Sequence, residues 1–270
     1  MSRTAPPVPD TLLGKRLHGA DLDAAGLAAW FADEQEGYAR IVGPADGAEA
    51  YGHANRFHAF RFLGERQFEC CLALGAASGR EYAPLAGRVR RFVAIEPGRG
   101  FWRPTIAGAP ADYRAPTPDG RIDLPDGACD LAGSFGVLHH IANVPDVMAE
   151  LGRVLKPSGV LILREPIASL GDFRVARPGL TRNERGIPPA MMERMLAEAG
   201  FSVVARRYVN FPGTRELPAR LGLASAWDNR WIVRLDYWIS RLTAWNARYW
   251  RPRLRDKLAP RSAYWVAIRT

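Results

Sequence analysis

The stretch CDLAGSFGVLHHIANVPDVMAELGRVLKPSGVLILREP, residues 129–166, changes its hydrophobic period twice. It begins with a short apolar run at 129–136, continues with apolar residues at helical spacing over 144–156, and leads into a second apolar run at 159–167. Short apolar runs bounded by glycine predict strands, and the amphipathic spacing between them predicts a helix. The stretch therefore predicts a strand–helix–strand unit.

The same alternation extends to both sides of this unit. Further strands are predicted at 67–74, 90–97, 201–211 and 261–269, and helices at 21–41, 48–63, 78–86 and 188–200. Short apolar strands that alternate with helices indicate a mostly parallel sheet with helices on both faces. The Pro-, Gly- and Asp-rich segment 100–127 gives no clear prediction.

The first predicted strand runs into a loop of small residues: Gly75, Ala76, Ala77, Ser78 and Gly79. Ligands of open α/β sheets bind at the carboxyl ends of the strands, where small residues let the backbone approach closely. Glu96 ends the next strand, 21 residues after Gly75. A carboxylate at about that offset of ~20 residues can accept the ribose hydroxyls of an adenosine. A purely structural end of the strand before Pro97 is the alternative.

A nicotinamide cofactor is disfavoured. The residues four before the three lysines are Thr11, Gly152 and Arg253, so the Tyr-x-x-x-Lys pair of the short-chain reductases is absent. The pyrophosphate fingerprint G-x-G-x-x-G is absent as well.

The segment 67–211 resembles the class I S-adenosylmethionine-dependent methyltransferases. The resemblance rests on CDL at 129–131, VLHHI at 137–141 and RVLKPSG at 153–159, in the order and spacing of that family. It implies a Rossmann-like, doubly wound, mostly parallel seven-stranded sheet with an antiparallel last strand. It also implies S-adenosylmethionine as the cofactor.

The resemblance further implies a set of cofactor-binding residues. They are Gly75, Ala76, Ala77 and Gly79 around the amino-acid and ribose part, Glu96 with Pro97 at the ribose, Asp123 or Asp126 at the adenine, and Ser134 and Phe135 at the methionine end. The expected reaction is O-methylation of a small molecule or a glycan.

Two positions depart from the family pattern. Ala73 stands where an acidic residue usually helps to hold the cofactor's ammonium group, and Ala77 replaces the middle loop glycine. A charge-assisted hydrogen bond contributes about 1.5–3 kcal/mol, so the missing carboxylate matters. Glu81 and the segment 51–61 are the substitutes to consider. A catalytically inactive methyltransferase-like binding or scaffold protein is the alternative function.

His139 and His140 are the predicted catalytic residues. They follow the strand that the resemblance places at the methionine end, where a general base could take a proton from a hydroxyl acceptor. The alternative is that one of them has a structural role at the start of a helix. Arg164 and Glu165 form a second polar cluster that could bind an acceptor. The three cysteines have neither disulfide nor metal-ligand spacing, so no metal site is expected.

Four segments are predicted: an N-terminal helical lid at 1–65, the cofactor-binding core at 66–211, an insertion at 212–260 and the last strand at 261–270. In the insertion, Trp231, Trp238 and Trp245 recur every seven residues. Leu235, Leu242, Ile232 and Ile239 are expected on the same apolar arc of a helix. Arg234 and Arg241 follow the first two tryptophans by three residues, within cation–π reach. A cap over the active site, a homodimer surface and peripheral membrane contact through 227–255 are the three interpretations.

Composition and charge bear on the cellular location of the protein and on its class of partner. The chain of 270 residues is 47% hydrophobic and 24% charged. Its formal net charge is +9, and nearly all of its basic residues are arginine. The insertion accounts for most of this net charge, with ten basic and four acidic residues. MSRTAPPVPD lacks an apolar signal region, so a cytoplasmic protein is expected, with membrane-peripheral contact left open. Nucleic acid is not favoured as a partner because no N-P-P-F/Y-like signature is present.

Overall fold

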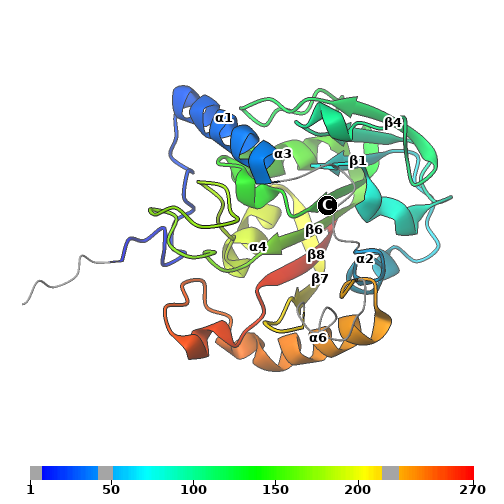
Figure 1. Cartoon of the computed structure of the whole chain (residues 1–270). Helices are drawn as coiled ribbons and strands as arrows, with labels where there is room; N and C mark the ends of the chain where they lie inside the picture. Colours follow the sequence, from blue (N-terminus) through cyan, green and yellow to red (C-terminus); the bar gives the residue numbers. More distant parts are fainter. Residues whose placement is uncertain (1–7, 42–50, 215–224) are drawn as a thin grey trace, which may run out of the picture.

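Eight strands form one open sheet in the computed structural model, which describes residues 8–41, 51–214 and 225–270 (Figure 1). The strands are β1 (Cys71–Leu74), β2 (Phe92–Ile95), β3 (Thr105–Ile106), β4 (Ala109–Arg114), β5 (Cys129–Phe135), β6 (Leu155–Pro166), β7 (Phe201–Val209) and β8 (Ser262–Arg269). Their order across the sheet is β3-β4-β2-β1-β5-β6-β8-β7.

Pairing within the sheet confirms the predicted Rossmann-like architecture. Strands β4, β2, β1, β5 and β6 are parallel neighbours, whereas β8 runs antiparallel to both β6 and β7. The expected seven strands are present, and the two-residue β3 adds an eighth as the antiparallel partner of β4. Strands β3 and β4 both lie in the segment 100–127, which has no clear sequence-based prediction.

Helices cover both faces of the sheet (Figure 1). The α-helices are α1 (Ala24–Ile41), α2 (Gly52–His58), α3 (Val144–Val154), α4 (Pro189–Glu198) and α6 (Arg230–Thr243). The 3₁₀ helices are η2 (Phe60–Leu63), η3 (Arg80–Leu85), η4 (Arg99–Phe101), η5 (Leu138–His140), η6 (Ala244–Asn246) and η7 (Leu254–Lys257). No helix of the described residues is long and apolar enough to cross a membrane.

Two predicted helices differ in detail from the observed ones. The helix predicted at 78–86 is the 3₁₀ helix η3 (80–85), and Pro84 within it has no backbone N–H to donate. The helix predicted at 48–63 is divided into α2 and η2, because the backbone at Ala59 (φ −130°) leaves the helical region. Neither change alters the order of the elements.

The alternation of side chains along β1 separates two hydrophobic cores. Leu72 and Leu74 point into a core that includes residues of α3 and α4. Cys71 and Ala73 point to the other face, where they pack with residues of η2 and η3. All four residues of β1 are buried, as expected for a central parallel strand with both faces covered.

Candidate active site

A cavity of about 300 Å³ lies at the carboxyl ends of β1, β2 and β5. Helix α1 forms one wall with Trp30, Glu34 and Tyr38, which follow one another at four-residue spacing. The opposite wall comes from the loop after β1, the end of β2 and the segment after β5. Open α/β sheets bind their ligands at this edge, and the volume is at the lower end of the range for ligand pockets.

The loop after β1 is held in place by Glu96. One carboxylate oxygen of Glu96 accepts the backbone N–H of Ala77 at 2.8 Å, and the other accepts that of Gly98 at 2.8 Å. Ala77 has a φ of +44°, in the left-handed region, and the Tyr113 hydroxyl donates to its carbonyl oxygen at 2.8 Å. Burial raises the pKa of Glu96, against the effect of the two N–H groups. Glu96 thus sets the shape of the loop and faces the cavity.

The two loop glycines have packing roles. Gly75 has a φ of +61°, and a Cβ there would lie 2.2 Å from Cγ2 of Val137. Gly79 has a φ of +77°, and a Cβ there would lie 2.5 Å from Cγ1 of Ile106. Gly75 lines the cavity, whereas Gly79 lies outside its lining, at the start of η3. Only the first glycine therefore borders the cavity directly.

The remaining predicted cofactor residues divide into two groups. Ala76, Ala77, Pro97 and Phe135 line the cavity. Ser134 is fully buried within β5, and Asp123 is exposed with its side chain 3.7 Å from Arg114. Asp126 is exposed too and pairs with Arg153 at 2.8 Å. The buried Ile122 lines the cavity on this side, whereas neither aspartate does.

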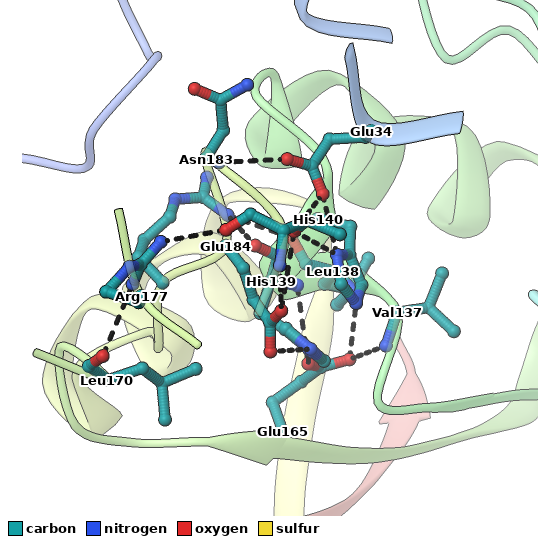
Figure 2. A network of polar contacts seen from close by, with 12 residues as sticks. Glu34, Val137, Leu138, His139, His140, Glu165, Leu170, Arg177, Asn183 and Glu184 are labelled. Atoms are coloured by element: carbon teal, nitrogen blue, oxygen red, sulfur yellow. Dashed lines mark hydrogen bonds and ion pairs between the residues drawn. The ribbon is translucent and has the colours of Figure 1, made fainter. Parts of the chain in front are cut away.

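His139 is buried between two carboxylates (Figure 2). Its Nδ1 lies 2.7 Å from Glu165, and its Nε2 lies 3.5 Å from Glu184. Glu165 also accepts the backbone N–H groups of Val137 and Leu138 at 2.9 Å each. Burial alone would lower the pKa of His139, but the hydrogen bonds to the two carboxylates raise it to about 9. His139 is therefore an imidazolium at neutral pH, with both ring nitrogens protonated.

His140 lines the cavity and, unlike His139, is neutral at neutral pH. Its Nδ1 is 2.8 Å from Glu34 of α1 (Figure 2). The Thr181 hydroxyl donates to the same carboxylate at 2.5 Å. Burial and the charge of His139, whose ring centroid is 4.1 Å away, lower the pKa of His140. Because Glu34 can only accept, the proton of neutral His140 resides on Nδ1, and Nε2 is the basic nitrogen.

Comparison with known proteins identifies the fold around this cavity. Residues 72–163 match the family model described as methyltransferase domain. This part of the chain, from β1 into β6, is therefore similar to a methyltransferase domain.

Solved structures of low sequence identity share the fold of this chain. The 1,6-didemethyltoxoflavin-N1-methyltransferase of Burkholderia thailandensis, solved with its substrate and S-adenosylhomocysteine, is 18% identical, with a TM-score of 0.56 over 93% of each chain. The [4+2]-cyclase SpnF is 14% identical, with a TM-score of 0.54 over 90% of this chain and 92% of that one. Because one of the two is described as a cyclase, the fold alone does not specify the reaction.

One curated relative matches a shorter segment. An uncharacterised 37.1 kDa protein in transposon TN4556 of Streptomyces fradiae is 32% identical over an alignment of 93 residues, and the match covers 30% of this chain. The chain spans only 27% of that relative's length.

The cavity has donor and acceptor groups that fit S-adenosylmethionine. The small loop residues from Gly75 to Ser78 bring bare backbone to the cavity. Each oxygen of Glu96 accepts one backbone N–H and keeps a lone pair for a ribose hydroxyl. Ile122, Ile141 and Val147 offer an apolar wall for a purine ring. These residues would hold the cofactor.

The site also shows what surrounds the alanine that replaces the usual carboxylate. Ala73 is fully buried beside Tyr82, whose hydroxyl donates to the carbonyl of Gly133 at 2.7 Å. Glu81, one of the two substitutes considered, lines the cavity. It pairs with Arg164 at 2.7 Å. Glu81 therefore places a carboxylate at the cavity wall, in η3, whereas the family pattern has it at the position of Ala73 in β1.

Several residues of this network were not predicted from the sequence. Glu34 is one, although a carboxylate between Trp30 and Tyr38 at four-residue spacing on an amphipathic helix was a readable signal. Arg185 is another: it is fully buried and donates to the carbonyl oxygens of His139 at 2.8 Å and Ile141 at 2.7 Å. Nothing in the sequence near Arg185 indicates this role, because its acceptors lie more than 40 residues away.

The histidine pair also has the donor set of a cation site. Ligand atoms of His139, His140 and Glu184 lie within 4.8 Å of one another. Because both ring nitrogens of His139 carry a proton, hydrogen bonding alone explains why two carboxylates lie beside this ring, and no ion is needed. The expectation that the chain binds no metal stays a prediction.

Proposed function

We propose that the chain is an S-adenosylmethionine-dependent methyltransferase that methylates an oxygen of a small molecule or a glycan. The observation that carries this proposal is the pair of His140 and Glu34 at the cavity wall, 2.8 Å apart. A hydroxyl acceptor must lose its proton during methyl transfer, and a neutral histidine oriented by a carboxylate can take it. An amine acceptor that is already neutral would have less need of such a pair.

When bound, S-adenosylmethionine supplies the activated methyl group. Glu96 would accept the ribose hydroxyls, and the backbone of Gly75 to Ala77 would follow the amino-acid part. Glu81 would contribute the negative charge for the ammonium group that Ala73 cannot provide. Its ion pair with Arg164 weakens that contribution, because the guanidinium already compensates the charge.

Proton transfer would proceed through His140. Nε2 of neutral His140 accepts the hydroxyl proton, and the imidazolium that forms remains paired through Nδ1 with Glu34. Burial raises the pKa of Glu34, but the hydrogen bonds from His140 and Thr181 lower it overall, so its carboxylate is ionised and ready to stabilise that charge. His139 would act as a positioning residue that keeps His140 neutral beforehand.

The walls of the cavity favour a ring-shaped acceptor. Trp30, Phe31 and Tyr38 line one side, and aromatic faces pack well against sugar or phenol rings. Burial and the charge of Glu96 raise the pKa of Tyr38 to about 12, so its hydroxyl stays a hydrogen-bond donor at neutral pH. A phenol or a sugar hydroxyl therefore suits both the base and the wall.

The alternative is an inactive binding or scaffold protein on the same fold. It is favoured by Ala73, by the compensation of Glu81 through Arg164, and by the left-handed Ala77 in the loop. The two functions differ in cofactor affinity, which can be measured before any acceptor is identified.

Titration calorimetry with S-adenosylhomocysteine tests the proposal. We expect micromolar binding by the wild-type chain and about 10- to 100-fold weaker binding by Glu96→Ala, because the hydrogen bonds that the ribose hydroxyls donate to the carboxylate are lost. Glu96→Gln, which keeps one acceptor oxygen, should lie between them. Glu69→Ala, at an exposed carboxylate, is the matched control and should bind like the wild type. No binding by the wild type at millimolar ligand would contradict the proposal and favour the scaffold.

A further inference from the structure

The outward face of α6 carries a stripe of large apolar side chains that continues into η6. Trp231, Trp238 and Trp245 are 61%, 57% and 85% exposed, and Leu235 and Leu242 between them are 45% and 72% exposed. At ~100° per residue these five positions share an arc of about 80° over about 21 Å of helix. A single exposed leucine is ordinary, but a continuous exposed stripe of this kind marks an interaction site.

The opposite face of α6 is engaged by the domain itself. Ile232 and Val233 are buried in a cluster with residues of α2 and of the segment before α6. Asp236 is fully buried and accepts the backbone N–H groups of Asn210 and Phe211 at 2.8 Å each. The sequence-based placement of Ile232 on the tryptophan arc is therefore wrong, because this residue packs inward. The exposed stripe is therefore not needed for packing α6 against the rest of the chain.

The stripe also plays no part in the cavity. None of the residues that line the cavity belongs to α6 or η6. The helix packs against β7 and α2, whereas the cavity lies at the ends of β1, β2 and β5. Figure 1 shows α1 and α6 on opposite sides of the molecule. A cap over the cavity therefore does not explain the stripe.

Arginine side chains border the tryptophans. The guanidinium carbons of Arg230 and Arg234 lie 4.7 and 5.7 Å from the ring centroid of Trp231, and that of Arg241 lies 5.8 Å from that of Trp238. The cation–π contacts predicted at three-residue spacing are thus confirmed for Arg234 and Arg241. Each contact holds a cation beside an exposed indole ring.

The exposed charge of this region is almost entirely positive. Its exposed basic residues are Arg230, Arg234, Arg241, Arg248, Arg253, Arg255 and Lys257. Of the three acidic residues between 225 and 258, Asp228 is exposed, whereas Asp236 and Asp256 are buried. A second copy of the chain, related by a two-fold axis, would bring the same cations together. The face is complementary to a negatively charged partner with an apolar interior.

We propose that this face of α6 docks on an anionic membrane surface. Tryptophan rings are favoured at the level of the lipid headgroups, where the apolar body is buried and the indole N–H stays hydrated. Guanidinium groups bind phosphate with two hydrogen bonds, so the bordering arginines would engage the anionic headgroups. Because the cavity lies on the other side of the molecule, docking would leave it open to its acceptor.

Vesicle co-sedimentation with the full chain tests the proposal. We expect binding to vesicles of phosphatidylcholine with phosphatidylglycerol and little binding to phosphatidylcholine alone. Arg234→Glu/Arg241→Glu should weaken binding by about 30-fold or more, since each basic residue near such a surface contributes roughly fivefold. The matched control is Arg90→Glu/Arg91→Glu, which changes the net charge equally at two exposed arginines before β2 and should stay within about threefold of the wild type.

The apolar part of the stripe is tested separately by Trp238→Ser at an exposed position. This variant should bind at least fivefold more weakly and show a smaller blue shift of tryptophan fluorescence on adding anionic vesicles. Absence of wild-type binding, equal loss in the Arg90/Arg91 control, or unchanged binding of Trp238→Ser would each overturn the proposal. A wild-type dimer in light scattering that Trp238→Ser dissociates would also overturn it, in favour of a second copy.

Discussion

His139 and His140 are adjacent in the chain, yet their pKa values move in opposite directions. Two carboxylates surround His139 and hold its charge, with the pKa raised to about 9. His140 is buried beside that charge, and its pKa is lowered. The sequence predicted both as candidate bases. Burial and hydrogen bonding favour His140, because only His140 lines the cavity and only its Nε2 is unprotonated.

Replacing His140 by Gln should abolish most of the turnover with a hydroxyl acceptor. Loss of a general base predicts a kcat about 10²- to 10⁴-fold lower, with the affinity for S-adenosylhomocysteine unchanged. The assay is S-adenosylhomocysteine release with a panel of phenols and sugars. Because the pKa of His140 is lowered, wild-type activity should already be on its plateau at pH 7. His53→Gln, away from the cavity, is the control. Full activity of His140→Gln would exclude the proposed base.

The loop after β1 contains a strained alanine where the family pattern has a glycine. An alanine at 77 is strained only if its φ is positive, and the structure has it at +44°. Such strain costs about 1–2 kcal/mol. The hydrogen bonds from Ala77 N–H to Glu96 and from Tyr113 to the Ala77 carbonyl oxygen hold the loop in this conformation.

At the scale of elements, α1 and α6 have the least predictable roles. Both were expected as helices from apolar spacing, but spacing does not tell which neighbour a helix meets. Helix α1 becomes a wall of the cavity, tied by the Trp30 indole N–H to the His140 carbonyl at 2.7 Å and by Glu34 to the His140 ring. Helix α6 turns its tryptophans outward because its buried Asp236 satisfies backbone N–H groups after β7.

Cofactor binding should protect α1 from hydrogen exchange. A ligand at 100 times its Kd stabilises the bound state by about 2.7 kcal/mol, so amides that exchange through opening of the cavity should slow by about 100-fold. Exchange measured by mass spectrometry with and without S-adenosylhomocysteine checks this for the peptide covering 24–38. The peptide covering α6 serves as the internal control and should change little. Protection of β1 and β2 without α1 would show that α1 is not part of the cofactor site.

For the whole molecule, His139 predicts a pH-dependent stability. Its folded-state pKa of about 9 lies above the ordinary histidine value of 6.5, so its contribution to stability is complete below pH 6.5 and is lost as the pH rises through 9. The shift corresponds to about 3 kcal/mol of unfolding free energy. Urea unfolding at pH 6 and pH 9 measures the loss of unfolding free energy in the wild type. Subtracting the loss measured for His139→Gln gives the part that is due to His139.

Glu184→Gln is a milder variant for the same measurement, since it leaves the Glu165 contact intact. It should show a smaller loss between pH 6 and pH 9 than the wild type. An equal loss in the wild type and in both variants would mean that His139 is not the titrating group.

The resemblance to the class I methyltransferases implied the antiparallel last strand. The sequence by itself determined the order of strands and helices along the chain, the loop at 75–79 and the carboxylate at 96. These features depend on local spacing and on turn chemistry, which neighbouring residues encode. The structure alone decided which histidine meets the cavity, that Glu34 and Glu81 stand at its wall, that Asp123 does not, and which face of α6 is outermost. Those outcomes depend on contacts between residues far apart in the chain, because burial and charge at one position are set by whatever packs against it.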